Sequence, residues 1–326
     1  MAIVLENRRA LPSGGLRGPW PALPLAEWRD TCQTLHRWTQ IVGKIRLALT
    51  PWLNHSWQAT LYITSRGLTT SPIPYGAGTF TIDFDFLAHA LVIRPDWGPE
   101  RRVALRPRTV ADFYDDVMRT LALLDVDVAI HRAPNELPDA VRFDEDHAHR
   151  SYDPEFVQRF WRVLVQADRV LKTFRTGFLG KASPVHFFWG SFDLAVTRFS
   201  GRRAPLHPGG VPHLPDNVTR EAYSHEVSSA GFWPGGGAID FPAFYSYAYP
   251  APIGFKDARV RPESAFFHDG LGEFILPYDD VRTAEDPGEV LLDFLQSTYE
   301  AAADLGAWDR PALECELGAP GRPRPV

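Results

Sequence analysis

The chain has 326 residues, of which 44% are apolar and 23% are charged, and its formal net charge is −6. This apolar content is typical of globular proteins and excludes a wholly disordered chain. The 34 basic and 40 acidic side chains give no positive excess for binding nucleic acid or an anionic membrane. The two cysteines, Cys32 and Cys315, lie far apart, which excludes a cysteine zinc motif and a disulfide framework. With no secretory signal and no long apolar run, we expect a cytoplasmic protein without a membrane segment.

The first half of the chain, residues 20–133, follows a Pro- and Gly-rich segment, residues 1–19, that we expect to be loose. Apolar residues recur every three or four positions from Trp28 to Leu49, which predicts an amphipathic helix. Residues 80–86 alternate between apolar and polar, as in an antiparallel strand with one covered face. The other elements expected in this half are strands at 55–66 and 103–107 and a helix at 110–124.

An acidic connector, residues 134–152, is expected to link the first half to a second half, residues 153–311. Asp153 followed by Pro154 predicts the start of a helix, because Asp is a favoured N-cap and Pro suits the first helical position. The remaining elements expected here are the rest of that helix to Phe178, strands at 186–198 and 274–278, and a helix at 290–305. Residues 312–326 are expected to be a disordered tail.

The two halves share a faint repeat. Trp57 precedes Arg66 by the same nine positions that separate Trp189 from Arg198, and each pair follows a long amphipathic helix. The sequence therefore predicts an α+β fold of two similar halves, each a helix, antiparallel strands and a helix, that arose by internal duplication and pack as one compact unit. The alternative is a chance similarity between two unrelated segments.

Differences between the halves identify candidate site residues. When Trp57 is aligned with Trp189, the apolar Leu61 corresponds to Asp193. Asp193 stands in an otherwise apolar run, residues 192–196, that we expect to be buried. A buried carboxylate needs a cation, several donors or a raised pKa, so Asp193 is a candidate catalytic base or ligand-orienting group. The alternative is a structural salt bridge from Asp193 to Arg198 or to a neighbouring strand.

A long connection, residues 200–216, stands where the first half has a shorter link. Connections of this length often serve as binding loops. The guanidinium groups of Arg198 and Arg202 suit an anionic substrate group, and we therefore predict a site beneath this loop. The alternative is that these arginines are ordinary solvated surface charges.

Two histidines and a carboxylate suggest a metal site. His186, His225 and Glu226 have the donor types that a divalent iron, zinc or manganese ion prefers, and Glu226 is also a candidate catalytic group. His225 and Glu226 are adjacent and share a site only at a strand end or bulge. For each histidine alone, a structural role is the alternative. The glycine run 235–237 lacks the spacing of a nucleotide-binding loop, so no nucleotide cofactor is expected.

Three classes of function stay open at this point. The leading hypothesis is a metal-dependent enzyme acting on a small polar or anionic metabolite in the second half. The second is a non-catalytic small-molecule binding protein with an aromatic pocket that includes Trp189, Trp233 and Tyr247. The third is a structural or interaction module. The oligomeric state is left open.

Four strings carry a resemblance to a family of uncharacterised bacterial proteins of similar length: residues 38–44, 68–76, 186–201 (HFFWGSFDLAVTRFSG) and 223–237 (YSHEVSSAGFWPGGG). The resemblance extends from about Trp20 to Leu313. It implies a cytoplasmic bacterial protein and attaches no activity to it. No catalytic residue is carried over from the family.

Overall fold

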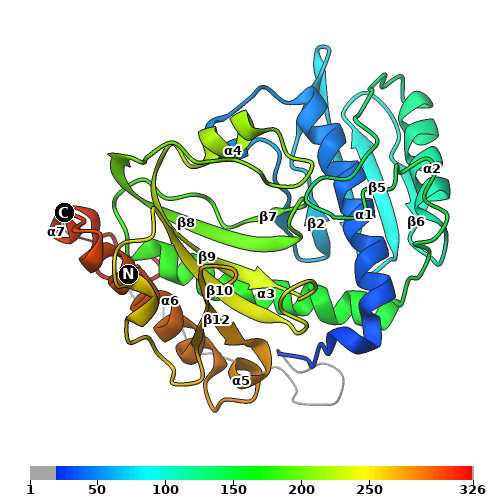
Figure 1. Cartoon of the computed structure of the whole chain (residues 1–326). Coiled ribbons are helices and arrows are strands. Elements are labelled where there is room, and N and C mark those ends of the chain that lie inside the picture. The colour runs from blue at the N-terminus through cyan, green and yellow to red at the C-terminus, as the bar shows by residue number, and fades with distance from the viewer. Residues whose placement is uncertain (1–19, 325–326) are drawn as a thin grey trace, which may run out of the picture.

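The computed structural model describes residues 20–324, which form two antiparallel sheets with helices packed against them (Figure 1). The first half contains two helices, α1 (Leu25–Leu49) and α2 (Val110–Ala122), and the short 3-10 helix η2 (Asn54–Ser56). Its strands are β1 (Tyr62–Ile63), β2 (Gly67–Thr69), β3 (Ile73–Tyr75), β4 (Gly78–Asp85), β5 (Ala90–Pro95) and β6 (Arg101–Ala104). They are ordered β1-β2-β4-β5-β6, and β3 pairs with β4.

The second half begins with helix α3 (Pro154–Thr176) and contains a sheet ordered β11-β12-β10-β9-β8-β7. The strands are β7 (His186–Phe188), β8 (Asp193–Arg203), β9 (His225–Trp233), β10 (Ala243–Tyr249), β11 (Phe266–His268) and β12 (Glu273–Pro277). The other helices are α4 (Asp216–Ala222), η3 (Phe255–Asp257), α5 (Tyr278–Arg282), α6 (Pro287–Leu305) and α7 (Arg310–Leu313).

Local sequence accounts for many of these elements. The Asp153 carboxylate accepts hydrogen bonds from the backbone N–H groups of Glu155 and Phe156, so it caps α3 as predicted. In β4 the side chains of Phe80, Ile82 and Phe84 are all buried, as the period-two alternation predicts for a strand with one covered face. The predicted α+β class with antiparallel sheets is confirmed.

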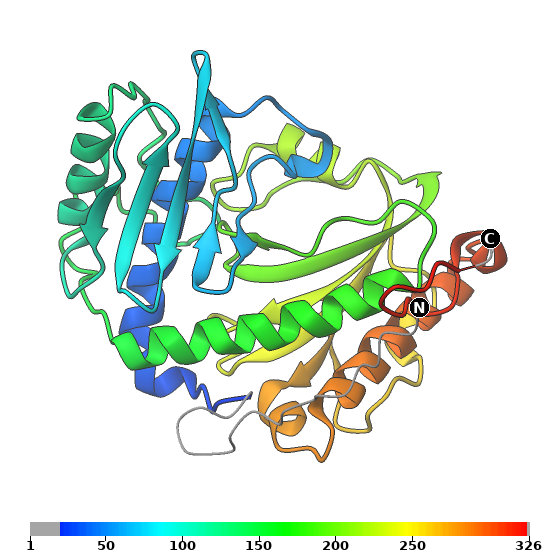
Figure 2. The same ribbon diagram turned by 180° about the vertical axis from the view of Figure 1, so that it is seen from behind.

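The halves meet at the first strand of each sheet. Leu61 and Phe187 exchange two backbone hydrogen bonds, of 2.8 and 2.7 Å, and their side chains are fully buried. Helix α3 crosses this junction and contacts β1, β8 and β9, as Figure 2 shows from behind. One apolar core includes residues of both halves. In chain order, each half contains a helix, antiparallel strands and a second helix. That the two halves arose by internal duplication remains a prediction.

Two predicted strands are wrong in extent. Most of 55–66 is η2 and turns, and only Tyr62–Ile63 is a strand. His55 and Ser56 have positive φ angles, which lie outside the β region. The segment 186–198 is broken after Phe188 by a turn in which Phe192 has a φ of 62°. The overlay of Trp57 on Trp189 as strand residues therefore fails, because both lie in turns.

The connector and the tail are more ordered than expected. In the acidic segment 134–152, the buried Asp146 lies 3.2 Å from the guanidinium of Arg37 in α1. Residues 312–324 lie against the end of α3, where the Cys315 thiol contacts the Thr176 carbonyl at 3.4 Å. The predicted loose segment 1–19 lies outside the described residues. No helix between residues 20 and 324 combines the length and the hydropathy needed to cross a membrane.

Candidate functional site

A cavity of about 520 Å³ lies between the two halves, on the face of the second sheet opposite α3 and α6. Helix α1, the turn after η2 and residues 131–136 supply one side, while β8, β9 and β10 supply the floor. Helix α4, which packs against η2, covers the cavity together with residues 211–215. The lining is mainly apolar and includes the aromatic side chains of Trp52, Trp57, Phe188, Trp189, Phe199, Tyr223, Tyr245 and Tyr247.

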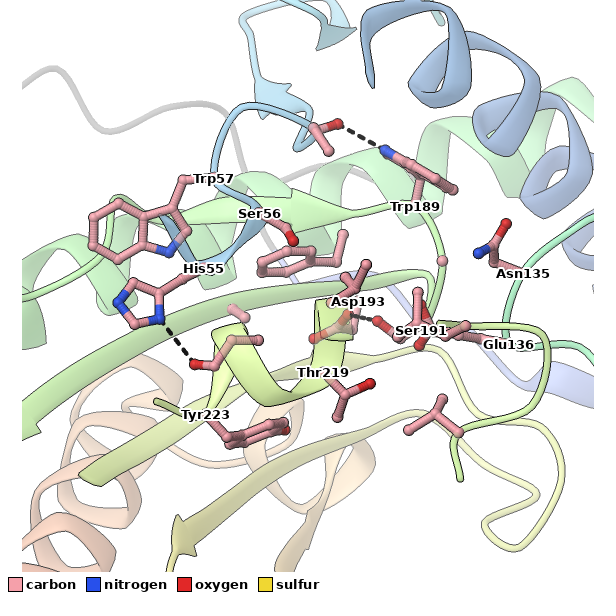
Figure 3. A pocket seen from close by; sticks show the side chains of 18 of the residues that line it. His55, Ser56, Trp57, Asn135, Glu136, Trp189, Ser191, Asp193, Thr219 and Tyr223 are labelled. Carbon is pink, nitrogen blue, oxygen red and sulfur yellow. Dashed lines mark hydrogen bonds between the residues drawn. The ribbon is translucent and has the colours of Figure 1, made fainter. Parts of the chain in front are cut away.

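Asp193, the first residue of β8, lies on the cavity floor and is buried. Its carboxylate accepts hydrogen bonds from the hydroxyl groups of Ser191 and Tyr245, and Figure 3 shows Ser191 beside it. Burial raises the pKa of Asp193, although both hydrogen bonds oppose the rise. The predicted burial of this carboxylate is confirmed, but two neutral hydroxyl groups hold it rather than a salt bridge to Arg198.

Glu136 and Lys44 lie near Asp193 at the same end of the cavity, where Figure 3 shows Glu136 beside Ser191. The Glu136 carboxylate packs over Gly190, where any Cβ would overlap it. Burial, and then the charge of Asp193, raise the pKa of Glu136 to about 7, against the opposing effect of Lys44. Burial lowers the pKa of Lys44 to about 8, against the opposing effect of Glu136.

His55 and Trp57 form the opposite end of the cavity (Figure 3). The Nδ1 of His55 lies 2.8 Å from the Ala222 carbonyl oxygen at the end of α4, and its Nε2 lies 2.6 Å from Lys181 Nζ. Burial is the main reason that the pKa of His55 is lowered. This contact joins the turn of the first half to the helix that covers the cavity.

Buried polar atoms without a partner lie in the cavity wall. Among the described residues, neither ring nitrogen of His186 has a hydrogen-bond partner, and neither do Ser56 Oγ and Thr219 Oγ1. Each of these residues lines the cavity. Buried polar groups are normally satisfied, so these unpaired atoms are an unusual feature of the cavity wall.

Four of the residues predicted from the sequence line this cavity: His186, Trp189, Asp193 and Tyr247. The indole N–H of Trp189 donates to the Ala59 carbonyl oxygen at 2.7 Å, and the Tyr247 hydroxyl lies 2.8 Å from that of Tyr223. Residues 211 and 213–215 of the predicted loop also contribute to the wall. The predicted position of the site beneath this loop therefore coincides with the cavity.

The predicted substrate-binding arginines lie elsewhere. Arg198 is five residues after Asp193 in β8 and thus projects from the other face of the strand. It is fully buried with its guanidinium over the rings of Phe174 and Tyr299, at 3.5 and 4.3 Å from the ring centroids. Arg202 forms an ion pair with Glu226 at 2.7 Å and donates to the Gly306 carbonyl. Both arginines make structural contacts.

The predicted metal ligands are not assembled. His186 lines the cavity. The ring of His225 lies edge-on to that of His55, with 6.3 Å between the ring centroids. The Glu226 carboxylate accepts a hydrogen bond from Ser200 and forms an ion pair with Arg202. Across residues 20–324, no group of three or more His, Cys, Asp or Glu side chains is placed to hold a metal ion. Trp233, predicted to line a pocket, packs instead with the small cluster of Ile239, Ala243 and Ile275.

Sequence reasoning missed Lys44 and Glu136. Lys44 is four residues after Gln40 in α1, and both are buried, so a polar pair interrupts the inward face of that helix. This polar pair could have indicated a functional site from the sequence, because buried Lys and Gln side chains require hydrogen-bond partners. Glu136 had no such signal, since it stands in a connector that reads as solvated.

Comparison with known proteins gives one match. A model of a family of unknown function, DUF5996, matches residues 20–315. No curated protein and no solved structure matches the chain.

Proposed function

Since the chain belongs to DUF5996, a family of unknown function, we propose its function from the cavity alone. The protein binds a small organic molecule with a mainly apolar body between its two halves. The polar end of the cavity, formed by Lys44, Glu136 and Asp193, exchanges protons with a polar group on that molecule.

The observation that carries this proposal is the strain in the cavity wall. Nine non-glycine residues between positions 20 and 324 have positive φ angles, and four of them line the cavity: His55, Ser56, Glu136 and His213. Such conformations cost free energy and tend to gather at functional sites. Here they stand beside ionisable groups with shifted pKa values, a second property of active sites.

The size and lining support the ligand class. A volume of about 520 Å³ falls within the range of about 300–1,000 Å³ that is usual for small-molecule sites. The aromatic side chains of Trp57, Phe188 and Trp189 favour an apolar or aromatic ligand body. The metal-dependent form of the enzyme hypothesis has less support, because the three ligands proposed for it do not converge.

Filling the cavity tests the proposal. Val218 of α4 lines the cavity and is half-buried, so Val218→Trp would place an indole in it. We expect wild-type protein to bind benzyl alcohol with a Kd on the order of millimolar, as its few heavy atoms allow, and Val218→Trp to lose at least tenfold in affinity. Ligand-observed NMR titration measures both.

Benzylamine reports on the acid groups in the same titrations. Its affinity should rise from pH 5 to pH 8, because Glu136 loses its proton in this range and then attracts a cation. The matched control is Val141→Trp, which adds the same side chain at an exposed position outside the cavity wall. Absence of binding to wild-type protein, or equal binding by Val218→Trp, contradicts the proposal.

A further inference from the structure

Lys44 is a buried amine that faces the cavity without a counter-ion. Its side chain is buried on α1, and Nζ donates a hydrogen bond to Asn135 Oδ1 and lies 5.7 Å from the ring centroid of Trp189. Within the described part of the chain, no carboxylate oxygen lies within 4.0 Å of Nζ. A buried ammonium group with one acceptor for its three donors is costly, which favours the neutral amine.

The other lysines have different surroundings. The chain contains only four, and Lys44 alone lines the cavity. Lys172 forms an ion pair with Asp168 at 2.7 Å on an exposed helix face, Lys181 contacts His55 through Nζ, and Lys256 is exposed. Lys172 and Lys256 serve as internal references for the reactivity of Lys44, whereas burial also lowers the pKa of Lys181.

Glu136 is placed to supply the proton that imine formation by an amine requires. It lines the same end of the cavity, close enough for its charge to act on Lys44. With a pKa of about 7, Glu136 is a mixture of acid and carboxylate at neutral pH, so it can both donate and accept a proton.

We propose that Lys44 is a nucleophile that forms an imine with an aldehyde or ketone ligand bound in this cavity. The inference rests on the proposed function, because the cavity must first bind the ligand. The neutral amine attacks the carbonyl carbon, a C–N bond forms, and proton transfer from nitrogen to oxygen gives a carbinolamine. Glu136 then protonates the hydroxyl group, water leaves, and a C=N bond replaces the C–O bond as an iminium. The N–H proton of the iminium returns to the Glu136 carboxylate, which leaves the imine. No oxidant or reductant is needed, and hydrolysis reverses the sequence.

Reductive trapping tests this inference on the intact protein. Benzaldehyde is incubated with the protein at pH 7 in the presence of sodium cyanoborohydride, which converts an imine into a stable benzylamine linkage. Peptide mass spectrometry then gives the labelling rate of each lysine. We expect Lys44 to be labelled at least about tenfold faster than Lys172, because burial lowers the pKa of Lys44 to about 8 and leaves more of this amine unprotonated at pH 7. Excess benzyl alcohol should protect Lys44 and leave Lys172 unchanged.

Variants assign the roles of the two groups. Lys44→Arg should remove the fast label, whereas Lys172→Arg should keep it. Glu136→Gln should slow labelling of Lys44 severalfold and lower the pH at which it is half-maximal, because the opposing negative charge is gone. A merely structural role for Glu136 would not shift that pH.

The outcomes separate the two proposals. If wild-type protein binds benzyl alcohol but Lys44 is labelled no faster than Lys172, the imine inference is overturned and the binding proposal stands. If neither binding nor protection is seen, both are overturned. Fast labelling of Lys44 that persists in Val218→Trp would show that the reaction does not occur in the cavity.

Discussion

At the scale of single residues, the proposed chemistry depends on three groups whose pKa values are shifted by burial. These groups are Asp193 in a strand, Glu136 in a connector and Lys44 in a helix. Burial disfavours the charged form of each side chain. Asp193 has two hydroxyl donors, whereas Glu136 has only the influence of Lys44 to stabilise its charge. The ionisation of Glu136 in the folded protein therefore costs stability.

This cost predicts a pH-dependent gain from Glu136→Gln. The pKa of Glu136 is about 7 in the folded protein and 4.5 when the chain is unfolded. The folded state therefore binds more protons than the unfolded state between these two pH values. The free energy of unfolding of the wild type should therefore fall as pH rises from about 4.5 to 7. In Glu136→Gln this fall is absent, and the variant should exceed the wild type by about 1–2 kcal/mol at pH 8.

Urea unfolding at pH 4 and pH 8 measures the effect of this substitution. The matched control is Glu145→Gln, a change in the same connector at a side chain that is 65% exposed. It should alter stability by less than about 0.5 kcal/mol at both values. A difference between Glu136→Gln and wild type that is the same at pH 4 and pH 8 would rule out ionisation as its cause.

At the scale of elements, the packing of α1 against the turn between β7 and β8 shapes the cavity wall. The indole of Trp189 lies over Gly43, so closely that a Cβ there would overlap it. Glycine lowers the helix propensity of α1 at this position, but it allows the close contact between the helix and the turn. Trp189 in turn forms part of the wall beside Lys44.

A double-mutant cycle tests this contact. Gly43→Ala alone should destabilise the protein by about 1–3 kcal/mol, because the indole must move from its buried position. In a Trp189→Ala background the same substitution should stabilise by up to about 1 kcal/mol, because alanine favours a helix over glycine. Denaturant unfolding gives all four values. Additive effects of the two substitutions would show that the contact does not constrain α1.

At the scale of the whole molecule, the two halves depend on each other. Backbone pairing of Leu61 with Phe187 joins the sheets, and a single apolar core contains side chains of both halves. Aromatic contacts add to the boundary, such as Trp28 with Phe160 and His36 with Phe192. Separation of the halves would expose these surfaces and open the cavity.

The shared core predicts one unfolding transition for the intact chain. Urea curves followed by far-ultraviolet circular dichroism and by tryptophan fluorescence should coincide, since neither half retains its core alone. A separately expressed fragment of residues 20–133 should lack a cooperative transition. Two resolved transitions, or a stably folded fragment, would mean that the halves are independent domains.

The sequence alone was sufficient for the α+β class, the four long helices and the cap at Asp153, because these follow from periodicity and from contacts between near neighbours. It also pointed to a buried carboxylate at Asp193, although the strand overlay behind that prediction was wrong. Only the tertiary structure decided the site itself. Lys44, Glu136 and Asp193 converge because sheet pairing and left-handed turns bring together segments that are distant in sequence, and no local pattern records that convergence.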